Sequence, residues 1–294
     1  MFKTLPIATL VATTLVTAHA SPDKTSAHTL LGQRTAAQMQ QNYDATPARC
    51  EGNAVPAHAC SGVLLRATKP GPSYHTWHHS PNTKAKGGLS FSYIRADIPT
   101  SQLAADGRSG FTLYPQLQRP QGSSYYEVLC AWPTDGDTWT RNSNGCGDNS
   151  QTPQVEQACQ RKGIDTAEQW IAEFRRSGDY KQQCAFDVRA RTPGRADAFH
   201  QSLRAKQLFG KELPFQWNEL ILRAWDESTS ARLPIQSFFH IEGMPRALEQ
   251  AQTDQRDWYK TNGTFIPVIR IRLPSEGTKQ ARFTYHEHEQ AVAR

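Results

Sequence analysis

Six cysteines that follow an apolar leader constrain this chain more than any other feature of its sequence. Residues 5–18 form an apolar run after Lys3, and Ala18-His19-Ala20 offers small residues where a signal peptidase cleaves. We predict that residues 1–20 are a signal peptide. An even number of cysteines in an exported chain predicts disulfide bonds between Cys50, Cys60, Cys130, Cys146, Cys159 and Cys184.

Several pairings of these cysteines are possible, and pairing between neighbours along the chain is the simplest. It would join Cys50 to Cys60, Cys130 to Cys146 and Cys159 to Cys184. Zinc binding is the alternative, but the sequence has no C-x-x-C pair and no second cluster at zinc spacing. We therefore expect three disulfides and no metal.

A membrane anchor is the alternative to a cleaved signal. The apolar run is shorter than the roughly 20 residues that span a bilayer, and no later run is longer. We expect a secreted or periplasmic protein without a membrane span. The net charge is +6, from 33 Lys and Arg against 27 Asp and Glu, and these basic residues are scattered. No nucleic-acid motif accompanies them, so a solubilising surface is favoured over a basic face for an anionic partner.

The apolar spacing predicts an α+β fold with a mostly antiparallel sheet, helical insertions and a single domain over residues 21–274. We expect a loose polar tail over residues 275–294, and an edge position for the last strand because it contains Pro267. The predicted strands cover 61–68, 88–95, 110–115, 125–132, 219–225, 234–241 and 265–273. The predicted helices cover 35–43, 166–176, 195–209 and 244–257, and long loops cover 69–86 and 133–154.

Polar side chains stand on three of these predicted strands. Arg66 lies near the end of an apolar strand, Ser90 and Ser92 share one face of the next, and Glu127 directly precedes VLCAW. Each has an ordinary structural explanation, at a strand end or on a solvent face. Their order and spacing together favour convergence on one ligand.

The segments LLRAT, GGLSFSYIR and EVLCAWP resemble the Arg, Ser-x-Ser and Glu signature of mono-ADP-ribosyltransferases and related NAD glycohydrolases. With CSGVLLRAT, YHTWHHSP and LPIQSFFHI, the longer pattern is similar to halovibrin, a family of secreted bacterial NAD glycohydrolases. The resemblance implies the ADP-ribosyltransferase fold. It also implies cleavage of NAD to ADP-ribose and nicotinamide, with NAD as substrate and no separate cofactor.

The chemistry of these residue types agrees with such a reaction. Cleaving the nicotinamide–ribose bond passes through an oxocarbenium-like cation, which the carboxylate of Glu127 would stabilise. Arg66 would bind the diphosphate through two hydrogen bonds, and Ser90 would orient the glutamate or contact the ribose. Phe91 or Tyr93 would pack on the nicotinamide ring. The predicted NAD-binding residues are thus Arg66, Ser90, Ser92, Phe91 and Tyr93.

Three departures from the family pattern bear on the acceptor. Ala67 follows Arg66 where glycine is common, and Phe91 stands between the serines where threonine is typical. Tyr125 stands two residues before Glu127, where arginine-modifying transferases carry Glu or Gln. The third departure favours water over a protein acceptor. There are two alternatives to NAD hydrolysis: a transferase acting on a host protein and a non-enzymatic secreted binding module. The partners of the protein would be NAD and either a host target protein or a cognate inhibitor.

A second carboxylate competes for the catalytic role, because Glu219 also precedes an apolar strand in WNELILRAW. The shorter spacing from Ser90 favours Glu127. A structure that brings Glu219 to Arg66 would assign the role to Glu219 instead.

Histidines gather in YHTWHHSP, at His75, His78 and His79, and again at His286 and His288. A metal site or a loop that covers the nucleotide is conceivable. An aromatic surface loop is the simpler reading.

Overall fold

A computed structural model describes residues 24–68, 75–98, 100–104, 107–136, 141, 145–146, 158–177, 184–189, 193–206, 217–275 and 277–292. The predicted signal peptide lies outside these residues, as does much of the expected loop over 133–154.

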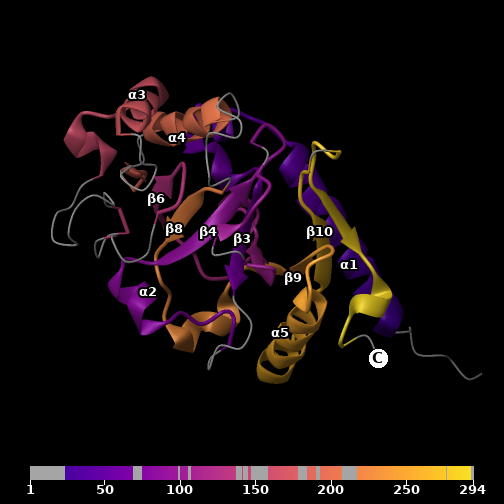
Figure 1. Ribbon diagram of the computed structural model, residues 1–294. Coiled ribbons are helices and arrows are strands. Elements are labelled where there is room, and N and C mark those ends of the chain that lie inside the picture. The colour runs from indigo at the N-terminus through magenta and orange to yellow at the C-terminus, as the bar shows by residue number, and fades with distance from the viewer. Residues whose placement is uncertain are drawn as a thin grey trace, which may run out of the picture.

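A large sheet forms the centre of the molecule (Figure 1). Nine strands lie in the order β11-β10-β9-β5-β3-β4-β8-β6-β7. Their bounds are β3 Val63–Thr68, β4 Leu89–Ile94, β5 Ser109–Leu113, β6 Val128–Trp132, β7 Phe186–Asp187, β8 Glu219–Leu222, β9 Ile235–Ile241, β10 Val268–Arg272 and β11 Arg282–Tyr285. A separate two-stranded sheet pairs β1 Arg49–Cys50 with β2 Val55–Pro56. Every pairing in the large sheet is antiparallel except that of β9 with β10, so the predicted α+β class is confirmed.

Helices cover the two faces of this sheet (Figure 1). The α-helices are α1 Lys24–Asp44, α2 Pro81–Ala85, α3 Ala167–Ser177, α4 Pro193–Lys206 and α5 Ala247–Asn262. Short 3₁₀ helices are η1 Glu51–Asn53, η2 Ala57–Ala59, η4 Gln116–Gln118, η5 Cys159–Lys162, η8 Glu227–Arg232 and η9 Glu287–Glu289. Residues of α1 pack with one face of β3, β9 and β10 in one apolar cluster. Residues of α3, α4 and α5 pack in a second cluster with the side chains that alternate to the other face.

Local sequence signals set the helix ends. Thr166 caps α3 by accepting a hydrogen bond from the backbone N–H of Gln169, and the Gln169 side chain accepts bonds from the N–H groups of Asp165 and Thr166. This reciprocal pattern is a capping box, and it agrees with the predicted helix start. Nearer the C-terminus, α5 ends at Asn262 and is followed by Gly263, whose φ of 68° suits glycine.

Two expectations about the C-terminal region are wrong. β10 is an inner strand between β9 and β11, since Pro267 lies one residue before the strand begins. Residues 282–285 of the expected loose tail form β11, which pairs with β10 in register. Beyond it, the buried side-chain amide of Gln290 bonds both the N–H and the C=O of Val268. These hydrogen bonds hold a segment whose polar composition resembles a disordered tail.

Three disulfides join Cys50 to Cys60, Cys130 to Cys146 and Cys159 to Cys184. The expected pairing of neighbours is confirmed. Within the described part of the chain, no helix has the length and apolar character needed to cross a membrane.

Candidate functional site

Three neighbouring strands carry the polar residues that the sequence singles out. Arg66 lies on β3, Ser90 on β4 and Glu219 at the start of β8, and β4 is hydrogen-bonded to both of the other strands. Ser90 lies 24 positions after Arg66 in the chain, and Glu219 lies 153 positions after it. Strand pairing therefore brings together segments that are far apart in the sequence.

Ser90 and Glu219 form the central contact of this site. The Ser90 hydroxyl donates a hydrogen bond to Oε2 of Glu219 at 2.6 Å. Ser90 pairs directly with Ile221, and Glu219 stands two residues before Ile221. Because alternate residues of a strand share a face, Ser90 and Glu219 point to the same side of the sheet.

Arg66 joins the site through the backbone of Ser90. Its Nη1 atom donates to the carbonyl oxygen of Ser90 at 2.8 Å. Ser90 thus contacts the arginine through its main chain and the glutamate through its side chain. Arg66 and Ser90 are half-buried, so solvent reaches two of the three residues.

Glu219 itself is only 5% exposed. Burial raises the pKa of its carboxyl group, and the nearby carboxylate of Asp135 raises that pKa further. The Arg141 guanidinium, the Ser90 hydroxyl and the backbone N–H of Gly136 act in the opposite direction, since each favours the ionised form. The carboxylate is therefore desolvated and held by several donors at once.

The segment that follows β6 supplies these further contacts. A Cβ atom at Gly136 would lie 3.0 Å from Oε2 of Glu219, so the main chain there approaches the carboxylate closely. Arg141 is fully buried and donates to the carbonyl oxygen of Gly88, next to the start of β4. The Cys130–Cys146 disulfide ties this segment back to β6.

A half-buried lysine contacts the main chain of the two segments that adjoin Glu219. Nζ of Lys206, at the end of α4, donates to the carbonyl oxygens of Pro133 and Trp217, the latter at 3.1 Å. Pro133 opens the segment that covers Glu219, and Trp217 stands two residues before Glu219. Burial lowers the pKa of Lys206 to about 7.

Glu127, the favoured catalytic candidate from sequence, lies elsewhere. Its carboxylate accepts a hydrogen bond from Nε of Arg223 at 2.7 Å, and both side chains are well exposed, 39% for Glu127 and 61% for Arg223. It stands just before β6, at a strand end, in agreement with the ordinary structural explanation. The structure brings Glu219, not Glu127, to Ser90.

Three of the predicted NAD-binding residues are fully buried. Phe91 packs edge-on against Phe111 in the core, and Tyr93 stacks on His200. The Ser92 hydroxyl accepts a hydrogen bond from the backbone N–H of Ala104. The expectation that Phe91 or Tyr93 meets a nicotinamide ring is wrong, because alternation places both on the face opposite Ser90 and inside the core.

The histidine-rich loop packs onto the core rather than standing free. His75 stacks on the buried Trp77, and Nε2 of His79 lies 2.5 Å from the carbonyl oxygen of Trp225. His286 and His288 lie close to each other, at the far end of the chain from this loop. Among the described residues, no group of three or more His, Cys, Asp or Glu side chains is placed to hold a metal ion.

The sequence reading missed Gly136, Arg141 and Lys206, although each contacts Glu219 or the segments beside it. Arg141 and Gly136 fall in a stretch rich in Gly, Asn and Asp that reads as an ordinary loop. The one available signal was that Cys130 and Cys146 enclose this stretch.

The arrangement is suited to stabilising positive charge. A desolvated carboxylate held in place by a hydroxyl and an amide acts on a developing cation more strongly than a carboxylate in water. The half-buried guanidinium of Arg66 reaches the main chain of Ser90, but strand register gives the Arg66 side chain the face of Phe111 and Tyr93, opposite the Glu219 carboxylate. Comparison of the chain with protein-family models and with curated proteins finds no match.

Proposed function

We propose that this protein is an exported NAD glycohydrolase in which Glu219 stabilises the ribosyl cation. The observation that carries the proposal is the hydrogen bond from Ser90 to Glu219, together with the bond from Arg66 to the backbone of Ser90, on three adjacent strands. It supplies the Arg, Ser and Glu combination that the resemblance to ADP-ribosyltransferases implies, with Glu219 in place of Glu127. The ADP-ribosyltransferase fold is part of the same proposal.

Each residue has a distinct task in the reaction. The guanidinium of Arg66 binds the diphosphate of NAD. The bond between ribose C1′ and the nicotinamide nitrogen breaks, and the electron pair leaves with neutral nicotinamide. Glu219 stabilises the cation left at C1′, and Ser90 holds the carboxylate in position. Water then forms the new bond to C1′ and releases one proton, which gives ADP-ribose.

Water is favoured as acceptor by the residue two positions before Glu219. Arginine-modifying transferases carry Glu or Gln there, and this chain has Trp217, which is buried. Neither glutamate has Glu or Gln two residues before it, since Trp217 precedes Glu219 and Tyr125 precedes Glu127. The argument for water as acceptor therefore holds for Glu219 as it did for Glu127.

The test is NAD hydrolysis by the purified mature protein, with free nicotinamide and ADP-ribose as readouts. Glu219→Gln preserves shape and removes the negative charge, so turnover is expected to fall on the order of 100-fold or more. Glu127→Gln is the matched control, because it breaks only an exposed ion pair with Arg223. Equal rates for the wild type and Glu219→Gln would remove Glu219 from the mechanism, and a wild type that leaves NAD intact would end the proposal.

Arg66→Ala separates binding from chemistry. It should raise KM for NAD more than it lowers kcat, because Arg66 is assigned to the diphosphate. A labelled NAD analogue incubated with candidate protein acceptors distinguishes transfer from hydrolysis, since hydrolysis leaves no label on protein.

A further inference from the structure

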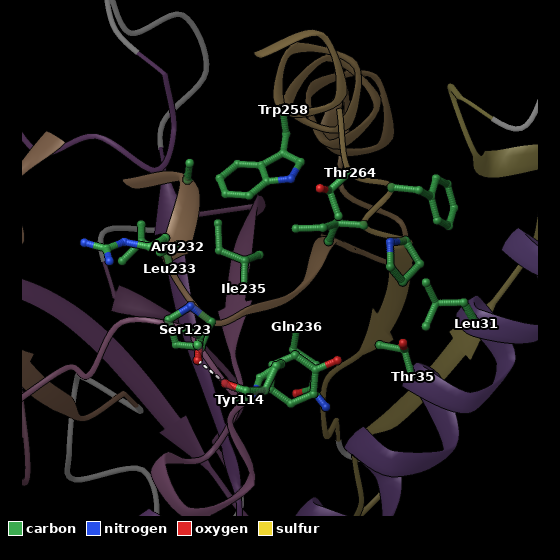
Figure 2. A pocket seen from close by; sticks show the side chains of 17 residues that line it. Leu31, Thr35, Tyr114, Ser123, Arg232, Leu233, Ile235, Gln236, Trp258 and Thr264 are labelled. Carbon is green, nitrogen blue, oxygen red and sulfur yellow. Dashed lines mark hydrogen bonds between the residues drawn. The ribbon is translucent and has the colours of Figure 1, made fainter. Parts of the chain in front are cut away.

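A cavity of about 360 Å³ lies away from the Glu219 site, between α1, α5 and the start of β9. Figure 2 shows Trp258 projecting from α5 toward Ile235, with Leu31 and Thr35 of α1 on the opposite side. Most of the wall is apolar, from residues such as Leu233 and Ile266. The cavity has room for a small molecule or an amino-acid side chain.

Two donors in this wall have no acceptor. Nε2 of Gln236 and Nε1 of Trp258 are both buried, and neither forms a hydrogen bond within the described part of the protein. Each residue is only 2% exposed and each lines the cavity. A buried N–H group without a partner costs about 1–3 kcal/mol, so two in one cavity wall indicate that an oxygen acceptor belongs there.

The backbone places Gln236 at this position through a β-bulge. Thr112 of β5 pairs with Ser237, and the next residue, Leu113, pairs with Ile235. Gln236 is thus an extra residue between two paired ones, and a bulge of this kind redirects a side chain away from regular alternation. The bulge places Gln236 among the residues that line the cavity.

The charge around the cavity has one sign. Among the described residues that line the cavity, Arg232 alone is charged, and its side chain is exposed. It forms no ion pair with the described residues. A ligand with a negative charge is therefore favoured, and a positively charged one is disfavoured.

We propose that this cavity is a second binding site, for a small apolar carboxylic acid that carries a further oxygen acceptor. The apolar body would pack against Leu31, Leu233 and Ile266, and its oxygens would accept hydrogen bonds from Gln236 and Trp258. Arg232 would attract the carboxylate. The site is separate from the NAD reaction and does not depend on it.

The test uses three probes of similar size on the full mature chain, measured by calorimetry and by protein-detected NMR. 3-Benzoylpropionate has a ring, a ketone and a carboxylate, and should bind. 4-Phenylbutanoate lacks the ketone and should bind about fivefold more weakly, as expected for one lost hydrogen bond. 4-Phenylbutylamine carries a positive charge and should not bind.

Variants identify the donors. Gln236→Met and Trp258→Phe keep the shape of each side chain and remove the N–H group, so each should weaken 3-benzoylpropionate binding about fivefold. Tyr259→Phe is the control, since it removes a hydroxyl from an exposed neighbour on α5. Thermal unfolding confirms that each variant is folded. No binding of 3-benzoylpropionate at millimolar concentration, or equal binding by wild type and both donor variants, would overturn the proposal, whatever the outcome of the NAD assay.

Discussion

At the scale of single residues, buried carboxyl groups govern how this protein responds to pH. Glu219 and Asp254 are both nearly inaccessible to solvent, and burial raises the pKa of each. Their surroundings differ: Glu219 lies near Arg141, whereas Asp254 accepts hydrogen bonds from Thr76 and Gln250. The first arrangement is suited to catalysis, and the second costs stability when the carboxyl ionises.

The pH profile of NAD hydrolysis tests the state of Glu219. Because the proposed mechanism requires the ionised form of Glu219 and burial raises its pKa, the acid limb of kcat should lie above the ordinary pKa of a glutamate. Ser90→Ala removes a hydrogen bond that lowers this pKa, so it should move the limb to still higher pH and reduce the rate. A limb that stays in place in Ser90→Ala would show that Ser90 does not act through Glu219.

Asp254→Asn should stabilise the protein at neutral pH. The pKa of Asp254 is raised to about 6 from its ordinary 3.8, so the folded state favours the neutral form. Stability is full below the unfolded pKa and falls as pH rises through about 6. Asparagine keeps the accepting oxygen and cannot ionise, and the gain at pH 7 should be about 3 kcal/mol in urea unfolding. The gain should vanish in acid; an equal gain at both pH values would contradict the assignment.

At the scale of elements, the segment between Cys130 and Cys146 is the part that completes the site. It brings the backbone of Gly136 and the side chain of Arg141 to a glutamate on a different strand. Its two ends are fixed by a disulfide and by the Lys206 contact at Pro133. The site therefore depends on this connection as much as on the three strands.

Replacing both Cys130 and Cys146 with alanine should lower stability and activity together. A loop of this length contributes about 3 kcal/mol to the free energy of unfolding. NAD hydrolysis should fall further than the folded fraction does, because Gly136 and Arg141 lose their fixed position. The control is the Cys50 and Cys60 pair, which lies outside the segment that covers Glu219. A variant lacking that disulfide should lose stability but keep its kcat, and equal loss of kcat in both variants would speak against a special role for the 130–146 segment.

At the scale of the whole molecule, a buried polar cluster joins the N-terminal region to α4. His58 of η2 lies edge-on to His200 of α4, and the buried Arg95 is near both. Burial, together with the charge of Arg95, lowers the pKa of both histidines, to about 4 for His58. Both rings are therefore neutral in the folded protein at neutral pH.

This cluster should make the fold sensitive to acid. A histidine with a depressed folded pKa contributes stability that is present above its unfolded pKa of 6.5 and is lost as pH falls toward about 4. The loss from His58 alone is about 3 kcal/mol. His58→Gln removes the titration, so urea midpoints measured across this range should fall less steeply for the variant than for the wild type. Parallel curves would exclude His58 as the acid-sensitive group.

Periodicity, cysteine spacing and helix capping are properties of short stretches of sequence. The sequence alone therefore determined the structural features that depend on such stretches. The strands around Arg66 and Ser90, the helix capped by Thr166 and the pairing of neighbouring cysteines are local in this sense. Only the tertiary structure decided between Glu127 and Glu219. Both directly adjoin short apolar strands, so local pattern cannot separate them, whereas strand order places β8 beside β4 and leaves Glu127 at an exposed strand end. Only the tertiary structure also showed β11 and the position of Arg141. Both lie in polar segments that are held by distant partners, β10 for β11 and Gly88 for Arg141, and the local sequence does not reveal these partners.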